Sequence, residues 1–325
     1  MPSLLISRLN EPPAQGRAEN AINGGDAEAF AMAKVILACR GEGQWGSRQD
    51  DNSKIDLMFA TDHPWHKGER MLILCQVKSG PSYGSILQEG GGFKLMGSAK
   101  AAAKKSSHDI CIIWVDRDND RAFWAYIHPD SKSDVQGYGS NHEINPAMIF
   151  DLARCMAGRG AAGGEGGRGV TLPDGADDIP QRRAFALRSY RQARFVESPV
   201  LGRIELTRLG WRHMFRKTRS AQNKNASLNL IPRLPSILQE RPSVVAITST
   251  QFHQRGNFDH RICEYLLKYE QINIRRRQEP NQRKITAHIR VIEEVRYPRD
   301  WEKKAMLSQL VDRRVVLKSA YYKEQ

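Results

Sequence analysis

Long apolar runs are absent from this chain of 325 residues, and no stretch reaches the roughly eighteen apolar residues that a membrane-spanning helix needs. The N-terminal residues Met1 to Arg8 are too few and wrongly flanked for a secretory signal. The five cysteines show no CxxC spacing, and three of them stand inside apolar runs, so we expect reduced core residues. These absences predict a cytoplasmic protein.

Acidic residues are scarce in the second half of the chain. From Arg182 onward there are 31 basic and 13 acidic side chains, a net charge of +18, whereas residues 1–181 hold 19 basic and 23 acidic side chains, or −4. This asymmetry is typical of a polyanion-binding module attached to a domain with other duties, so nucleic acid is the expected partner. No long helix with a separate apolar face can be drawn through the basic half, which argues against membrane binding.

Composition divides the chain into four segments. Residues 1–23 contain Pro-Pro and Asn-Gly-Gly and predict an irregular arm. Residues 24–157 predict an α/β domain with a mixed sheet flanked by helices, and residues 182–325 predict a smaller, basic α+β domain. Between them, residues 158–181 are rich in Gly, Ala and Asp and predict a flexible linker. The length suffices for two separate cores.

The elements expected in the first domain alternate between helices and strands. They are a helix from near Asp26 to Arg40, strands Ile55–Phe59 and Leu72–Ser79, a helix Phe93–Lys105, strands Ile110–Val115 and Ala122–Ile127, and a helix Pro146–Met156. In the second domain we expect strands Arg203–Leu206, Ser243–Thr248, Ile285–Tyr297 and Arg313–Tyr322, with helices Thr207–Lys217 and Asp300–Leu310. The segment Arg261–Ile274 is ambiguous between helix and strand.

Strand alternation brings three polar side chains together. In a strand from Leu72 to Ser79, Gln76 and Lys78 share one face because successive side chains point to opposite faces. If Ile55–Phe59 is the neighbouring strand of a hairpin, Asp56 can point to the same side. A carboxylate, an amide oxygen and an ammonium group would then converge.

These groups suit the cleavage of a phosphodiester. That reaction requires charge neutralisation on a phosphorane-like transition state and an oriented, partly deprotonated water. Mg²⁺, or Mn²⁺, supplies both and prefers oxygen ligands such as the Asp56 carboxylate and the Gln76 amide oxygen. Lys78 would hold the attacking water or stabilise the new negative charge. Glu28 would add a second carboxylate from its helix, although a glutamate favoured by the helix dipole is an equal interpretation.

The combination of Asp56 with Gln76-x-Lys78 resembles the restriction-endonuclease-like PD-(D/E)XK nuclease superfamily, in the variant where glutamine replaces the second acid. The likeness spans roughly residues 20–155 and includes Gly25-Asp26-Ala27-Glu28. It implies that Asp56, Gln76 and Glu28 are metal ligands and that Lys78 is the catalytic lysine. Ile55 stands where the family name places proline, and Gln76 brings no charge, so metal affinity would depend on Asp56 and Glu28.

The resemblance implies a Mg²⁺-dependent endonuclease acting on foreign nucleic acid, with DNA favoured over RNA, in prokaryotic antiviral defence. A homodimer, or a partner protein of a defence system, would fit such a role. The basic half would then grip the substrate, since each neutralised phosphate releases counterions. The residues expected to bind nucleic acid are Arg212, Arg216, Lys217, Arg219, Arg275, Arg276, Arg277, Arg283 and Lys284. On a helix, Arg208, Arg212 and Arg216 would project from one face.

Two alternatives remain open. The stretch Ile204–Met214, followed by a late strand ending in Lys318-Ser319-Ala320-Tyr321, resembles the metal-independent ribonuclease superfamily of barnase, EndoU, colicin nucleases and RelE toxins. That resemblance, over roughly residues 185–325, implies a site with His213 as general base or acid and with Arg216, Arg219, Ser319 and Tyr321 on the phosphate. The other alternative is a non-catalytic nucleic-acid-binding protein with a decayed metal site.

Overall fold

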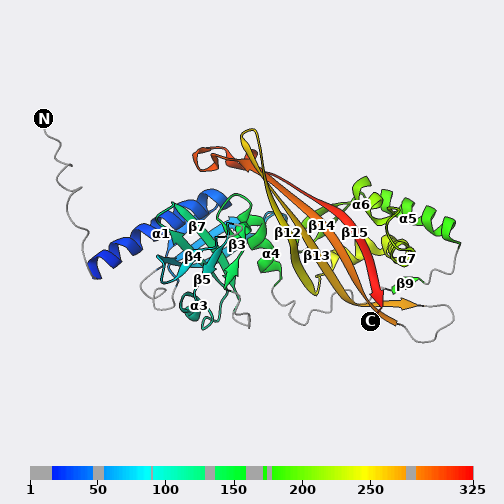
Figure 1. Ribbon diagram of the computed structural model, residues 1–325, viewed down its shortest axis with the longest axis horizontal. Coiled ribbons are helices and arrows are strands. Elements are labelled where there is room, and N and C mark those ends of the chain that lie inside the picture. Colours follow the sequence, from blue (N-terminus) through cyan, green and yellow to red (C-terminus); the bar gives the residue numbers. More distant parts are fainter. Residues whose placement is uncertain are drawn as a thin grey trace. The chain divides into compact units, whose positions relative to one another are not determined.

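The computed structural model describes residues 17–46, 55–88, 91–128, 136–158, 171–173, 178–275 and 283–324 (Figure 1). The chain forms two compact units. The first comprises Met1–Thr61 and Met71–Met148, and the second comprises Asp62–Arg70 and Ile149–Gln325. Among the described residues, no helix combines the length and apolar character needed to cross a membrane.

A five-stranded mixed sheet forms the centre of the first unit. Its strands follow the order β1-β2-β3-β6-β7, where β1 is Glu42–Trp45, β2 is Leu57–Asp62, β3 is Arg70–Ser79, β6 is Ile110–Asp116 and β7 is Arg121–Ile127. β3 and β6 run parallel, with Gln76 opposite Ile112, whereas β1 and β2, like β6 and β7, pair antiparallel. All seven residues of β6 are buried, as expected of a strand covered on both faces. The four predicted strands are therefore confirmed, and β1 is an addition.

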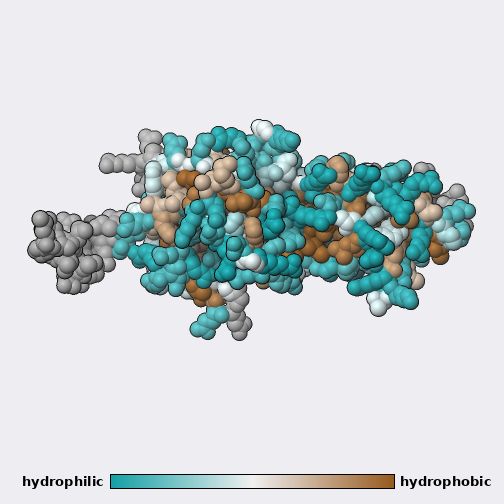
Figure 2. All heavy atoms as spheres, turned by 90° about the horizontal axis from the view of Figure 1, so that it is seen from above, coloured by the Kyte–Doolittle hydropathy of each residue, from teal (hydrophilic) through white to brown (hydrophobic). Residues whose placement is uncertain are grey.

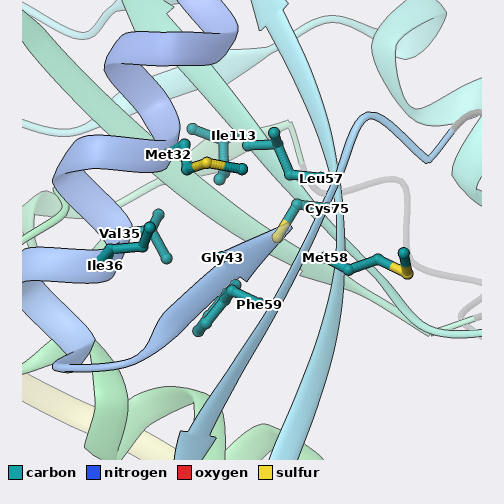
Figure 3. A pocket seen from close by; sticks show the side chains of 9 residues that line it. All are labelled: Met32, Val35, Ile36, Gly43, Leu57, Met58, Phe59, Cys75 and Ile113. Atoms are coloured by element: carbon teal, nitrogen blue, oxygen red, sulfur yellow. The ribbon is translucent and has the colours of Figure 1, made fainter. Parts of the chain in front are cut away.

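Helix α1 (Arg17–Cys39) covers one face of this sheet. Ala27, Ala31, Val35 and Ala38 recur every three or four residues and are almost fully buried, which gives the helix one apolar stripe. Figure 3 shows Met32 and Val35 of α1 beside Leu57, Cys75 and Ile113 of the sheet, where they line a small apolar pocket.

A second, three-stranded sheet packs on the opposite face. Its strands are β4 (Gly84–Ile86), β5 (Phe93–Leu95) and β8 (Gly137–Tyr138), in the order β4-β5-β8, with helix α3 (Gly97–Ala103) and the 3₁₀ turn Ser140–His142 in the connections. The core here joins Phe93, Leu95 and Ala99 to Ile112 and Trp114 of β6. The helix predicted for Phe93–Lys105 is thus wrong at its start, because Phe93 to Leu95 pair with β4 and β8.

The predicted arm is also wrong in its last part, because α1 begins at Arg17 and runs through Gly24 and Gly25. Residues 1–16 lie outside the described chain. A helical glycine costs only about 1 kcal/mol relative to alanine, so two of them do not end a helix that packs well further along. The helix ends at Cys39, one residue before the predicted end, because Arg40 adopts a left-handed φ of 54°.

The second unit is built on a seven-stranded sheet of much longer strands. Its order is β10 (Phe195–Ser198), β11 (Gly202–Glu205), β15 (Asp312–Glu324), β14 (Arg283–Pro298), β13 (Phe258–Arg275) and β12 (Val244–Arg255), and β9 (Thr171–Pro173) pairs with β13. On β14, every second residue from Ile285 to Val295 is buried, and the residues between them are partly exposed. This sheet therefore has an inner, apolar face and an outer, polar face.

Helices cover the inner face of this sheet (Figure 1). They are α5 (Ile179–Ala193), α6 (Arg208–Met214), α7 (Ala221–Leu230) and α8 (Leu234–Gln239), with the 3₁₀ turn Ile231–Arg233 between the last two. Met214, Leu230, Leu234 and Leu238 join Tyr265 and Leu267 of the sheet in one core. On the side of the molecule that Figure 2 shows, hydrophilic residues predominate and apolar residues gather in patches.

Several expectations for the second unit are confirmed and others are wrong. β11, β14 and β15 match predicted strands, and the ambiguous segment is β13. The helix expected for Asp300–Leu310 is instead two 3₁₀ turns, Trp301–Lys303 and Leu307–Gln309. Within the predicted linker, β9 is an ordered strand with Leu172 fully buried, while residues 159–170 and 174–177 lie outside the described chain. The predicted last helix of the first domain is α4 (Met148–Ala157), which from Ile149 on belongs to the second unit.

A buried ion network fixes α4 to the sheet of the second unit. It consists of Asp151 and Arg154 of α4, Arg261 of β13, Glu293 of β14 and Arg313 of β15. Arg154 donates to Asp151 Oδ1 at 2.6 Å and to Glu293 Oε2 at 3.0 Å, and Arg313 Nε donates to Glu293 Oε1 at 2.8 Å. Arg261 donates to Asp151 and is only 1% exposed. Because an unpaired buried charge is strongly destabilising, these five groups depend on one another.

Candidate functional site

The Asp56 carboxylate lies against strand β3. Asp56 directly precedes β2, and its backbone N–H donates to the Cys75 carbonyl at 2.9 Å. Its Oδ2 accepts a hydrogen bond from the Val77 N–H at 2.6 Å. Since Val77 stands between Gln76 and Lys78, the carboxylate is held next to the residues whose side chains the sequence predicted to join it.

Gln76 contributes a buried oxygen that lacks a donor. The residue is 1% exposed, and its Oε1 accepts no hydrogen bond from any described residue. Its neighbour across the sheet is Ile112, which is apolar and fully buried. A buried acceptor without a partner costs about 1–3 kcal/mol, so native structures rarely keep one without a reason.

Lys78 shares the strand face of Gln76 and is partly exposed at the end of β3. Its Nζ lies 5.7 Å from the centre of the Tyr83 ring. The neighbouring strand residue, Trp114, donates its indole N–H to the Gly80 carbonyl at 3.0 Å, which holds the turn that follows. Gly80 needs its positive φ of 83° for that turn. Lys78 thus combines a fixed backbone with an ammonium group near solvent.

Glu28 lies on the partly buried side of α1, one helical turn before Met32. In Figure 3, Ile36 lies near Gly43 and Phe59, whereas Met32 lies further along, near Leu57 and Ile113. A further turn toward the start of α1 leads past Leu57, to the end of the sheet where Asp56 precedes β2. Helix α1, however, packs on the face that holds Cys75 and Ile113, whereas Gln76 is in register with Ile112, which lies in the core on the face of the three-stranded sheet, so the participation of Glu28 stays a prediction.

We name Glu28, Asp56, Gln76 and Lys78 the β3 site. Among the described residues, no three His, Cys, Asp or Glu side chains are grouped as a metal site. The oxygen donors that lie beside β3 are instead the Asp56 carboxylate and the amide oxygen of Gln76, and a contribution from Glu28 stays a prediction. Oxygen donors of this kind fit a hard cation such as Mg²⁺ or Mn²⁺, and the buried acceptor on Gln76 is the group that such an ion would satisfy.

The structure places the predicted nucleic-acid-binding residues in different ways. Arg212 is exposed on α6, but α6 ends at Met214, so Arg216 and Lys217 follow the helix and the predicted single face with Arg208 is wrong. Lys284 is exposed at the start of β14. Arg276 and Arg277 lie outside the described residues, as do the side chains of Arg275 and Arg283.

The residues of the alternative ribonuclease site come together. The guanidinium of Arg219 lies 5.0 Å from the Tyr321 ring centre. Burial lowers the pKa of His213, and the positive charges of Lys318, Arg216 and Arg219 lower it further, while Glu264 opposes them. Ser319 is 7% exposed and pairs with Arg290 across β14 and β15.

Four neighbouring residues were not predicted from the sequence as site residues: Glu264, His288, Arg290 and Lys318. Glu264 accepts from Arg290 Nη1 at 3.2 Å and from Lys318 Nζ. The His288 ring stacks on Tyr321, with centroids 5.3 Å apart and an interplanar angle of 11°. Alternation along β14 would have placed His288 and Arg290 on the outer face, and a strand assignment for Arg261–Ile274 would have added Glu264.

We name these groups the outer cluster. Its members are His213, Arg216, Arg219, Glu264, His288, Arg290, Lys318 and Tyr321. Comparison of the chain with protein-family models, with curated proteins and with solved structures finds no match.

Proposed function

We propose that this protein is a metal-dependent nuclease whose reaction takes place at the β3 site. One observation carries the proposal: the hydrogen bond from the Val77 N–H to Asp56 sets a carboxylate beside the backbone between Gln76 and Lys78. The buried Gln76 Oε1, which has no hydrogen-bond donor among the described residues, adds a second oxygen that a donor or a cation would satisfy. Both features are what a divalent-cation site requires.

Each residue has a distinct part in the proposed reaction. The oxygens of Asp56 and Gln76, with Glu28, would hold Mg²⁺ or Mn²⁺. When bound, the ion would neutralise charge on the phosphate and lower the pKa of a water. The Val77 N–H fixes the orientation of the carboxylate. The Lys78 ammonium would orient the attacking water or bind a phosphate oxygen as negative charge develops.

The order of elements supports the same proposal. Helix α1, strands β2 and β3, helix α3 and strand β6 occur in the order that the resemblance to PD-(D/E)XK nucleases implies, with β1, β4 and β5 as additional strands and with β6 parallel to β3. The two departures keep their consequences. Ile55 replaces the proline of the family name, and the neutral Gln76 reduces the negative charge available to the ion.

The proposed substrate is nucleic acid, with DNA favoured over RNA. The net charge of +18 from Arg182 onward supports this class of substrate, because phosphate contacts supply most of the non-specific affinity for nucleic acid. A role in prokaryotic defence, with a homodimer or a partner protein to cut both strands, rests on the family resemblance alone.

A cleavage assay tests the proposal. Supercoiled plasmid and a folded RNA are incubated with the protein in Mg²⁺, in Mn²⁺ and in EDTA. We expect cleavage with either metal, none in EDTA, and none by Lys78→Ala, while Lys67→Ala, which removes an exposed lysine from the loop after β2, cleaves normally. Cleavage by Lys78→Ala at the wild-type rate would rule out the β3 site.

A second candidate function is a metal-independent ribonuclease in the second unit, in place of the β3 site. It is favoured by the convergence of His213, Arg216, Arg219 and Tyr321. The lowered pKa of His213 leaves its ring neutral at pH 7, which suits a general base. RNA cleavage that survives EDTA and disappears in His213→Gln would establish this function. Binding with no cleavage under any condition would favour the non-catalytic alternative.

A further inference from the structure

Three long strands present a polar outer face in the second unit. Glu264 of β13 and His288 and Arg290 of β14 alternate with fully buried residues, and Tyr321 of β15 lies opposite His288 between buried Ala320 and partly buried Tyr322. These four side chains therefore project from the side opposite the core. The register shifts between Arg290 and Val291, which leaves Lys318 as an additional residue on β15. A bulge of this kind changes the direction of a side chain, and here Lys318 reaches Glu264.

The segment that follows helix α6 brings Arg216 and Arg219 close to the same face. β11 pairs with β15 only through Glu205 and Val316, so beyond that pair the helices occupy the edge of β15. Gly210 of α6 touches the Leu317 carbonyl so closely that an added Cβ would stand 2.5 Å from it. On α7, Ser227 Oγ donates to the Ala320 carbonyl at 2.6 Å. This close approach explains how Arg219, after α6, reaches the ring of Tyr321.

Positive charge exceeds negative charge in the outer cluster. Glu264 is its one carboxylate, and it already accepts from Arg290 and Lys318. Arg216 and Arg219 add two more guanidinium groups. The pKa of His288 is lowered by burial and then by Lys323, Lys268 and Arg290, so cations surround this ring as well. The group that would balance such a cluster is an anion.

An aromatic pair lies among these cations. His288 and Tyr321 stack with their rings nearly parallel, and both residues remain partly exposed. In a duplex the bases stack on each other and offer no free face, whereas unpaired bases stack on protein aromatic rings with a gain of about 1–3 kcal/mol per base. Cations that follow a backbone, together with an aromatic platform, are typical of surfaces that bind single strands.

We propose that the outer cluster is a binding site for single-stranded nucleic acid, with the His288–Tyr321 pair stacking on an unpaired base and Arg216, Arg219 and Arg290 holding the phosphates beside it. The choice of ligand rests on the proposed function, which makes nucleic acid the substrate. The site itself is separate from the β3 site and does not need a metal ion. The proposal therefore assigns the second unit a preference for unpaired strands.

Fluorescence anisotropy of a labelled 20-nucleotide single strand, measured in EDTA, tests this site. We expect Tyr321→Leu to bind roughly 5- to 100-fold more weakly, because a stacking platform is lost, whereas Tyr321→Phe keeps the ring and binds like the wild type. Arg216→Gln/Arg219→Gln should bind at least about 10-fold more weakly. For two lost phosphate contacts, its slope of log affinity against log salt should fall by about 1.4.

Matched controls separate this site from general charge. Arg255→Gln/Lys303→Gln removes the same charge from exposed positions, with Arg255 at the far end of the β12–β13 hairpin, and should change the affinity by less than about threefold. Thermal melting of each variant excludes misfolding as the cause. Equal affinity for a hairpin duplex, or wild-type affinity in Tyr321→Leu, would overturn the proposal.

The two proposals fail in different ways. Lys78→Ala should bind the single strand in EDTA as tightly as the wild type, because it leaves the outer cluster intact. If Tyr321→Leu binds normally while Lys78→Ala still abolishes cleavage, only the single-strand site is wrong. If Lys78→Ala cleaves normally while Tyr321→Leu loses binding, the outer cluster is supported and the β3 site is wrong.

Discussion

The β3 site and the outer cluster are incomplete in opposite senses. At the β3 site, a buried oxygen of Gln76 has no donor and the Asp56 carboxylate lies beside it, so the missing partner is positive. In the outer cluster, cations outnumber the single carboxylate Glu264, so the missing partner is negative. Under the two proposals, one chain would bind a cation at the β3 site and an anion at the outer cluster, which are the two things that a metal-dependent nuclease must bind.

The buried ion network is a third charge cluster, and here the carboxylates already have their cations. Glu293 is fully buried and accepts from Arg154, Arg313 and Tyr265. Both of its oxygens have donors, whereas the Nε atoms of Arg154 and Arg261 have no acceptor among the described residues. Seven buried side-chain N or O atoms of the described residues lack a hydrogen-bond partner, so such atoms are not confined to the β3 site, and Gln76 Oε1 is the one among them that can only accept.

The largest expected effect is the loss of cleavage when the charge of Asp56 at the β3 site is removed. Asp56→Asn keeps the shape of the side chain but removes its charge, so cleavage in Mg²⁺ should fall by at least about 100-fold, as for other lost transition-state charge interactions. Asp62→Asn, at the exposed other end of β2, is the matched control and should cleave normally. Equal activity in the two variants would contradict the assignment of Asp56.

The next largest effect is a loss of stability when Glu293 of the buried ion network is replaced. Glu293→Gln leaves three arginines without their shared carboxylate, and we expect the free energy of unfolding to fall by about 3–5 kcal/mol. Urea denaturation measures this value. Glu197→Gln, an exposed position on β10, should change it by less than about 0.5 kcal/mol. A loss below about 1 kcal/mol for Glu293→Gln would show that the network does not stabilise α4 against the sheet.

Acid should weaken the same network. Burial alone would raise the pKa of Glu293, but Arg154, Arg313 and Arg261 lower it to about 2 from a usual value of 4.5. A lowered folded-state pKa contributes stability above pH 4.5, and this contribution is lost as the pH falls from 4.5 toward 2. Melting curves of the wild type should therefore lose more stability in this range than those of Glu293→Gln. Parallel losses would contradict the pairing.

The smallest expected effect is a change in single-strand affinity when His213 of the outer cluster is replaced. The pKa of His213 is lowered by burial and by Lys318, so the ring is uncharged at pH 7.5. His213→Gln should therefore change single-strand affinity at this pH by less than about twofold. Weaker binding by the variant that develops only as the pH is lowered, measured by the same anisotropy titration, would fit a ring that becomes charged in acid. A tenfold loss at pH 7.5 would instead indicate that His213 contacts the strand directly.

The position of Asp56 beside the Gln76–Lys78 segment could be predicted from the sequence because its geometry is local. Gln76 and Lys78 share a face by alternation within one strand, and Asp56 needs only the next strand of a hairpin to reach them. The sequence did not predict that the Val77 N–H binds the carboxylate or that Gln76 is left without a donor, since both depend on how β2 and β3 pair.

The outer cluster was only half predicted because it is built from segments distant in sequence. His213 and Tyr321 came from a family resemblance, but Glu264 lay in a segment that was ambiguous between helix and strand. Lys318 reaches Glu264 through a register shift that no sequence pattern marks. The arginines of the buried network read as surface charge in the sequence, because only the tertiary fold shows that Arg154 and Arg261 meet Asp151 and Glu293.

Calorimetric titration of Mn²⁺ into the protein tests the central claim most directly, because it reports the cation without any nucleic acid. We predict that the wild type binds the ion, that Asp56→Asn and Gln76→Leu lose this binding, and that Asp62→Asn keeps it. Wild-type Mn²⁺ affinity in both Asp56→Asn and Gln76→Leu would contradict a metal site beside β3.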